Sequence, residues 1–167
     1  MQLPSFVYGE WLEGRGGAVG LRDATSGALI AEASSQGVDF ARVLHHARGQ
    51  GGPALRAMTF HQRAGLLKAL AKMLGEHKEE FYALSTLTGA TKADSWVDID
   101  GGIGTLFVYA SKGTRELPNQ RVLVDGAPEA ISKGGSFIGQ HICVPLEGAA
   151  VHINAFNFPV CGMLEKM

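Results

Sequence analysis

The sequence predicts an α/β protein in which short strands and ribbons surround a helical segment, followed by one buried strand that leads into a helix. Three observations support this fold class. In residues 1–35, short strand-like segments lie on either side of turn signals. In residues 37–110, apolar residues recur at helical spacing. After Pro118 the pattern becomes extended again, and it ends in a short, continuous apolar run.

Two hairpins are predicted near the N-terminus. Each joins two short segments: Phe6–Tyr8 with Trp11–Leu12, and Leu21–Asp23 with Leu29–Ala31. The turns are marked by Gly9-Glu10 and by Ser26-Gly27, because glycine adopts the backbone angles that tight turns require. Strands with so few apolar residues are more typical of an edge ribbon than of a core.

The first two helices have clear boundary signals. Phe40, Val43, Leu44 and Ala47 recur as one helical face, and Gly51-Gly52-Pro53 is expected to end that helix. Thr59 and Gln62 then form a capping box, in which each side chain bonds the other residue's backbone N–H. Behind it lies an apolar stripe made by Leu67, Leu70, Ala71 and Leu74.

Two further helices are predicted before the second extended region. One carries Phe81, Leu84 and Thr88, and Gly89 is placed to close it in a left-handed conformation. The other runs from about Asp94 to Ala110, with an apolar face formed by Trp96, Ile99, Ile103, Leu106, Phe107 and Ala110. Gly101, Gly102 and Gly104 each cost about 1 kcal/mol in a helix relative to alanine. Close backbone packing against another element is the simplest reason for them, and a helix kink is the alternative. Asp94, Asp98 and Asp100 are interpreted as solvated carboxylates.

The last third of the chain is predicted to be extended. Arg121–Val124 and Phe137–Val144 are strand candidates, and Ala149–Asn154 has the composition of a buried parallel strand. Pro159 suits the first turn of a helix that would run to Met167. One buried strand cannot form a sheet, so its pairing strands are expected to lie outside these 167 residues.

The composition limits the kind of partner. The chain has 167 residues, is 46% hydrophobic and 19% charged, and carries a formal net charge of −1. Nucleic acids and anionic membranes favour a basic excess, so neither is expected as a partner. With two cysteines, no signal peptide and no long apolar run, we expect a cytoplasmic protein.

The segment most informative about chemistry is the predicted strand-to-helix turn that contains Asn157. Ligands of open α/β sheets bind outside the carboxyl ends of the strands. An asparagine amide at that position can donate a hydrogen bond to a developing oxyanion, next to a helix N-terminus that also favours negative charge. Spacing alone leaves the alternative open that Asn157 only caps the helix.

Several segments resemble the aldehyde dehydrogenase family. Ala155-Phe156-Asn157-Phe158-Pro159 resembles the family's Pro-Trp-Asn-Phe-Pro motif, with alanine and phenylalanine in place of its proline and tryptophan. Phe6–Leu12 is similar to the family's opening GGEW ribbon, Ala24–Gly27 to its NPATG segment, and Leu84–Lys92 to its ETGKP stretch. The resemblance covers essentially the whole chain and implies the N-terminal part of the aldehyde dehydrogenase fold.

The resemblance also implies roles for three residues. Asn157 corresponds to the oxyanion-hole asparagine, and Asn154 and Phe156 correspond to positions that line the nicotinamide end of NADP or NAD. Three segments are similar to the family branch that oxidises a CoA-linked semialdehyde in phenylacetate degradation: Pro53–Phe60, Ala93–Ile99 and His152–Pro159. A homo-oligomer is expected by the same resemblance.

The family's nucleophilic cysteine, general-base glutamate and cofactor-binding lysine would all follow Asn157 in the chain. Cys161 lacks the family's GQxC context and is interpreted as a packed thiol. These 167 residues are therefore expected to be an inactive N-terminal fragment, and a natural short binding or assembly module is the alternative. The implied organisation is a cofactor-domain ribbon and helices at 1–115, the start of an oligomerisation ribbon at 116–144, and the first strand, turn and helix of the cofactor-binding sheet at 145–167.

Two other signals are rejected. Gly102-Ile103-Gly104 has Phe107 where a dinucleotide fingerprint needs a third glycine, and no strand precedes it. The spacing of His141, Cys143, His152 and Cys161 matches no compact zinc module, so no metal is expected.

Overall fold

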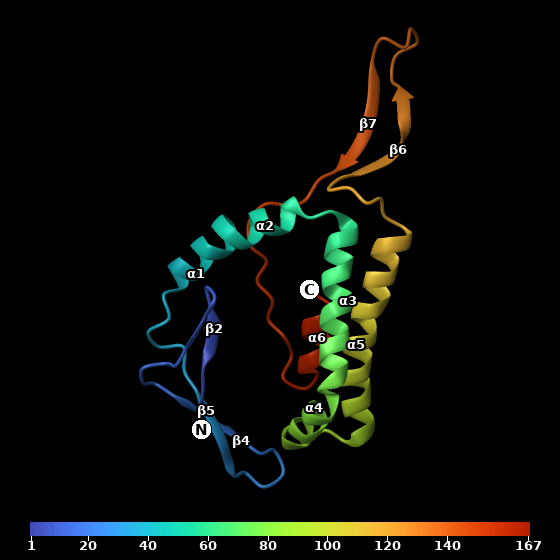
Figure 1. Cartoon of the computed structure of the whole chain (residues 1–167). Helices are drawn as coiled ribbons and strands as arrows, with labels where there is room; N and C mark the ends of the chain where they lie inside the picture. Colours follow the sequence, from blue (N-terminus) through green and yellow to red (C-terminus); the bar gives the residue numbers. More distant parts are fainter.

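The computed structural model describes residues 1–167, and it has three parts that follow one another along the chain (Figure 1). Short strands form the N-terminal part, and helices α1 to α5 form the middle. A ribbon that projects from one end and a short helix packed back against α5 form the last part (Figure 1). Helix and sheet are thus mixed, as predicted.

The N-terminal part contains five short strands in two sheets. They are β1 (Gln2–Leu3), β2 (Ser5–Val7), β3 (Glu10–Leu12), β4 (Val19–Arg22) and β5 (Leu29–Ala33). β2 and β3 form one antiparallel pair, and β5 lies between β1 and β4 in the other sheet. Both predicted hairpins are confirmed: Tyr8 and Gly9 have φ of 38° and 88°, and Gly27 has φ of 72°. Positive φ at both central residues is what a two-residue hairpin turn favours.

The first helical segment is longer than predicted. Helix α1 (Phe40–His46), the π-helical turn η1 (Ala47–Gly51) and helix α2 (Gly52–Ala57) follow one another without a break. The expected end at Gly51-Gly52-Pro53 is therefore wrong. Pro53 is the second residue of α2, directly after the π-helical turn, and the helical segment continues through it. The segment ends at Met58, whose backbone is extended.

Helix α3 (Phe60–Glu76) begins at the predicted capping box. The Thr59 side chain accepts from the N–H of Gln62, and the Gln62 side chain accepts from the N–H of Thr59. Helix α4 (Lys78–Ser85) continues into a 3-10 turn, η2 (Thr86–Thr88), which ends at Gly89 with φ of 82°. Both predicted boundary signals are thus confirmed.

Helix α5 (Lys92–Arg115) is the longest element and extends beyond the predicted range at both ends. Ile99, Ile103, Leu106 and Ala110 are buried, as expected, but Trp96 is 62% exposed and Phe107 is 41% exposed. Those two aromatic residues lie at the edges of the apolar face, where no other element of this chain covers them. No helix of the protein combines the length and the apolar character needed to cross a lipid bilayer.

The hydrophobic core lies where α3, α5 and the C-terminal helix α6 (Pro159–Leu164) meet. Its fully packed residues are Ala71, Ile99, Ile103, Leu106 and Leu164. Only 11 of the 167 residues are buried, and the accessible surface is 11817 Å². A compact monomer of 17.7 kDa would expose roughly 7,900 Å². Much apolar surface is therefore left uncovered within this chain.

The predicted ribbon is formed by β6 (Leu123–Ala130) and β7 (Ile138–Cys143), which pair antiparallel and project away from the helices (Figure 1). The predicted buried strand at Ala149–Asn154 is wrong for this chain. The segment is extended but pairs with no strand, and Val151 and Ile153 are 84% and 89% exposed. A buried parallel strand needs neighbouring strands on both sides, and these 167 residues supply none next to it.

Candidate functional site

The candidate site is the turn that leads from the extended segment into α6. All three predicted residues, Asn154, Phe156 and Asn157, lie in it, and all three are exposed. Phe156 is 90% exposed. The Asn154 side-chain oxygen accepts a hydrogen bond of 3.4 Å from Nζ of Lys166, which follows α6. The turn therefore presents these side chains to the outside of the chain.

A buried carboxylate from α5 holds the start of α6. Oδ1 of Asp98 lies 2.7 Å from the backbone nitrogen of Cys161, and Oδ2 lies 3.3 Å from that of Val160. Asp98 is only 3% exposed, which corrects the interpretation of this residue as solvated. The residue at the N-cap position, Phe158, offers no capping side chain. Asp98 thus caps α6 from another helix and places negative charge at its positive end.

The same two helices touch at Gly102. A Cβ added there would lie 2.9 Å from Cα and 3.1 Å from the backbone nitrogen of Cys161. Close backbone packing, the predicted reason for glycines in α5, is confirmed for this glycine. Gly101 and Gly104 have no such neighbour, and no contact in the structure explains them.

The Asp98 cap determines which hydrogen-bond donors of the turn remain available to a ligand. The N–H groups of Val160 and Cys161 already donate to Asp98, and Pro159 has no N–H. The helix N-terminus is therefore occupied by the protein's own carboxylate, contrary to the expectation that it would favour an external anion. The exposed amide of Asn157 is a free donor.

Sequence reasoning missed Asp98, although a signal was present. Asp98 lies four residues before Gly102 and three residues after Ser95, so all three share one helical face. Ser95 and Gly102 are both buried. An aspartate on that face has to find donors, because burial of an unbonded carboxylate costs several kcal/mol.

Cys161 has the character of a packed thiol. It is half-buried, whereas Cys143 is exposed. Burial raises the pKa of the Cys161 thiol, and the nearby Glu165 and Asp98 carboxylates raise it further. A raised pKa leaves the thiol protonated near neutral pH, which is the opposite of what a nucleophilic cysteine needs.

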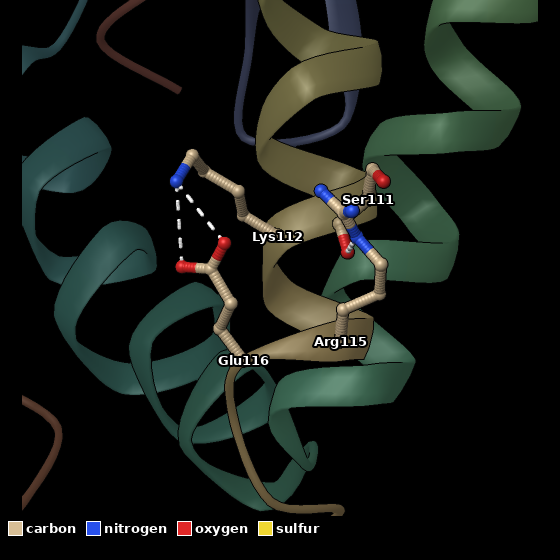
Figure 2. Close-up of polar contacts among 4 residues, drawn as sticks. All are labelled: Ser111, Lys112, Arg115 and Glu116. Atoms are coloured by element: carbon tan, nitrogen blue, oxygen red, sulfur yellow. Dashed lines mark hydrogen bonds and ion pairs between the residues drawn. The ribbon is translucent and has the colours of Figure 1, made fainter.

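The site residues do not line the apolar cavity beside α3 and α5. That cavity, of about 900 Å³, lies along α3 and α5 near the C-terminus, with apolar walls that include Leu67, Leu70 and Leu106. Lys112 and Glu116, near the end of α5, also line this cavity. Nζ of Lys112 lies 3.1 Å from a carboxylate oxygen of Glu116 (Figure 2). Asn154, Phe156 and Asn157 are not part of its wall.

A dinucleotide would need an enclosed site at this turn. Asn154 and Phe156 are exposed on a segment that pairs with no strand, so these residues alone do not form a site for NADP or NAD. No group of three or more His, Cys, Asp or Glu side chains lies together as a metal site would require.

Residues 11–167 match the aldehyde dehydrogenase family, and the chain belongs to that family. It is 43% identical to the 3,4-dehydroadipyl-CoA semialdehyde dehydrogenase of Aromatoleum evansii over 99% of its own length and 32% of the relative's. It is also 26% identical to the NADP+ succinate-semialdehyde dehydrogenase GabD of Escherichia coli (strain K12), over 97% of its length and 32% of the relative's.

Solved structures agree on the fold. The lactaldehyde dehydrogenase of Escherichia coli superposes with a TM-score of 0.62 at 18% identity, over 75% of this chain and 26% of that one. A second lactaldehyde dehydrogenase structure gives 0.61 with the same coverage. The chain spans about a third of the length of the curated relatives it matches.

Proposed function

We propose that these residues form the N-terminal part of an NAD(P)-dependent aldehyde dehydrogenase that oxidises a CoA-linked semialdehyde in phenylacetate catabolism. The observation that carries this proposal is the 43% identity, over 99% of the chain, to a relative named for a CoA-linked semialdehyde. The uncovered apolar surface supports it, because the remaining two-thirds of such an enzyme would have much of that surface to pack against.

Asn157 is the proposed oxyanion donor. When a cysteine thiolate of the complete enzyme adds to the aldehyde carbon, the carbonyl oxygen takes the electron pair and becomes negatively charged. The Asn157 amide would donate a hydrogen bond to that oxygen, and a preorganised donor of this kind stabilises the transition state by about 3–4 kcal/mol. Its exposure in this chain supports the role, since the amide is not engaged elsewhere.

NADP or NAD is the proposed hydride acceptor of the complete enzyme, with Asn154 and Phe156 at its nicotinamide end. The complete enzyme is proposed to be a cytoplasmic homo-oligomer. The 167 residues alone are proposed to be inactive, because neither of their two cysteines has the context of the nucleophile. Cys161 is half-buried with a raised pKa.

The test is Asn157→Ala in the complete enzyme that contains these residues. We expect kcat to fall about 100- to 1,000-fold, with a smaller change in KM for the aldehyde. Asn119→Ala is a matched control, since Asn119 bonds Thr59 far from the turn. An unchanged kcat in Asn157→Ala would refute the oxyanion role, and turnover by the isolated 167 residues would refute their proposed inactivity.

A second candidate function is a short assembly module built on the same fold. The exposed apolar side chains of the ribbon favour it, because Val124, Ile138 and Ile142 are 46%, 62% and 55% exposed. An open ribbon of this kind can recruit strands from another chain. A reading frame that continues with the family's cysteine and glutamate supports the enzyme, and a stop codon after Met167 supports the module.

A further inference from the structure

Backbone hydrogen bonds hold the turn that carries Asn157 at one end only. No backbone group of residues 145–157 forms a hydrogen bond to another backbone group. The segment before Asn157 is exposed and pairs with no strand. Whatever fixes the Asn157 side chain within this chain must therefore act from the α6 side.

On that side, the first fixed points are the two amides held by Asp98. Only Phe158 and Pro159 separate Asn157 from Val160, and the ring of Pro159 fixes its own φ. The bonds from Val160 and Cys161 to the Asp98 carboxylate, at 3.3 and 2.7 Å, thus set the direction in which the chain leaves α6 toward Asn157.

The part of α5 that carries Asp98 is held in place by close packing. The next residue, Ile99, is fully buried in the core, and Gly102 one turn later lets the α6 backbone approach α5 closely. A small displacement of a catalytic group by a remote change can cost about 100-fold in rate. We propose that Asp98 is a positioning residue that holds Asn157 in place by capping α6 across the helix interface. This inference rests on the proposed function of Asn157.

The first test uses the 167-residue chain and does not depend on activity. Asp98→Ala is compared with Asp125→Ala, which removes an exposed carboxylate from β6. We expect amide hydrogen exchange of Val160 and Cys161 to become at least about 10-fold faster in Asp98→Ala only. Retained protection of the α3 and α5 amides shows that the variant is folded. Unchanged exchange at Val160 and Cys161 overturns the cap and the proposal.

The second test measures kcat and KM in the complete enzyme. We expect Asp98→Ala to lower kcat about 10- to 100-fold with little change in KM, and Asp98→Asn to recover part of the loss because it keeps one acceptor oxygen. Gly102→Ala should also lower kcat, and its control Gly101→Ala should leave kcat unchanged.

The outcomes separate the two proposals. A normal kcat in Asp98→Ala together with a reduced kcat in Asn157→Ala overturns the positioning role and leaves the oxyanion role intact. A normal kcat in Asn157→Ala overturns both. Reduced kcat in both variants, with faster exchange only at the start of α6, supports the positioning role.

Discussion

Gly102 and Cys161 bring the backbones of α5 and α6 into direct contact, since a Cβ on Gly102 would lie 2.9 Å from Cα of Cys161. The obstructing atoms belong to backbone, which cannot swing aside as a flexible side chain can. Gly101 is adjacent in the same helix, yet nothing lies within 4 Å of the Cβ it would carry. The two glycines are therefore expected to respond to the same substitution in opposite ways.

Gly102→Ala is expected to lower the free energy of unfolding by about 1–3 kcal/mol, because the helices must separate to admit the methyl group. Gly101→Ala is expected to raise it by up to about 1 kcal/mol, since alanine has the higher helix propensity and meets no clash. Urea denaturation of both variants measures the difference. Equal effects at the two positions would contradict the close contact.

The capping box of α3 gives a second stability prediction. Thr59 Oγ1 accepts from the N–H of Gln62 and also donates to Oδ1 of Asn119, 2.7 Å away, so it joins α3 to the loop after α5. Thr59→Ala removes both bonds and is expected to cost about 1–2 kcal/mol, near the upper end for an N-cap. Thr59→Ser keeps the hydroxyl and serves as the control. A Thr59→Ala variant as stable as the Ser variant would show that the hydroxyl is unimportant.

The features that could be predicted from sequence are those set by local chemistry. The Thr59–Gln62 box, the left-handed Gly89 and the two hairpin turns each depend on residues within a few positions of one another, and each is confirmed. The family motif around Asn157 identified the turn in the same way. Nothing in the structure tests the roles assigned to Asn154, Phe156 and Asn157, which stay predictions.

The features that sequence reasoning missed depend on what lies beside a residue in space. The sequence pattern predicts a solvated Asp98, because its donors, Val160 and Cys161, lie more than sixty positions away. Trp96 and the segment Ala149–Asn154 have the composition of buried elements, but burial requires a covering partner. The sequence predicts that Pro53 ends a helix, but the structure has helical turns on both sides of it.

The interface of α4 and α5 gives a prediction about pH. Oδ1 of Asp100 lies 2.5 Å from Nζ of Lys78, and Oδ2 lies 2.5 Å from the Tyr82 hydroxyl. The hydrogen bond from Lys78, followed by that from Tyr82, lowers the pKa of Asp100 below its ordinary value of 3.8. The hydrogen bond to Asp100 raises the pKa of Tyr82 from 10.0 to about 12.

These shifts act at opposite ends of the pH scale. Because the pKa of Asp100 is lower in the folded state, its contribution is present above pH 3.8 and is lost as the pH falls through the folded pKa. Because the pKa of Tyr82 is higher in the folded state, its contribution is present below pH 10.0 and is lost as the pH rises toward about 12.

Asp100→Asn should therefore be less stable than the wild type at neutral pH, and the difference should shrink below about pH 4. The effect is expected to be modest, because the Lys78 and Asp100 side chains are 38% and 25% exposed and water screens their attraction. Denaturation followed across this pH range provides the measurement, with Asp125→Asn as the control. A difference in stability between the wild type and Asp100→Asn that stays constant with pH would count against a stabilising role for the ionised Asp100 carboxylate.

The ribbon gives the last prediction, on association. Ile138 and Ile142 lie on the same face of β7, and Val124 is directly opposite Ile142 in the antiparallel pair. All three side chains are exposed, and β6 and β7 each leave one strand edge without a partner. We expect the 167-residue chain to self-associate through this face, because association would bury apolar surface and pair the free edges.

Ile142→Lys should shift the sedimentation profile toward monomer, since a lysine on that face would be buried without a counter-charge. His141→Lys places the same charge one residue away on the other face and should leave the profile nearly unchanged. If both variants dissociate equally, or if the wild type is already a stable monomer, the apolar face of the ribbon is not the contact.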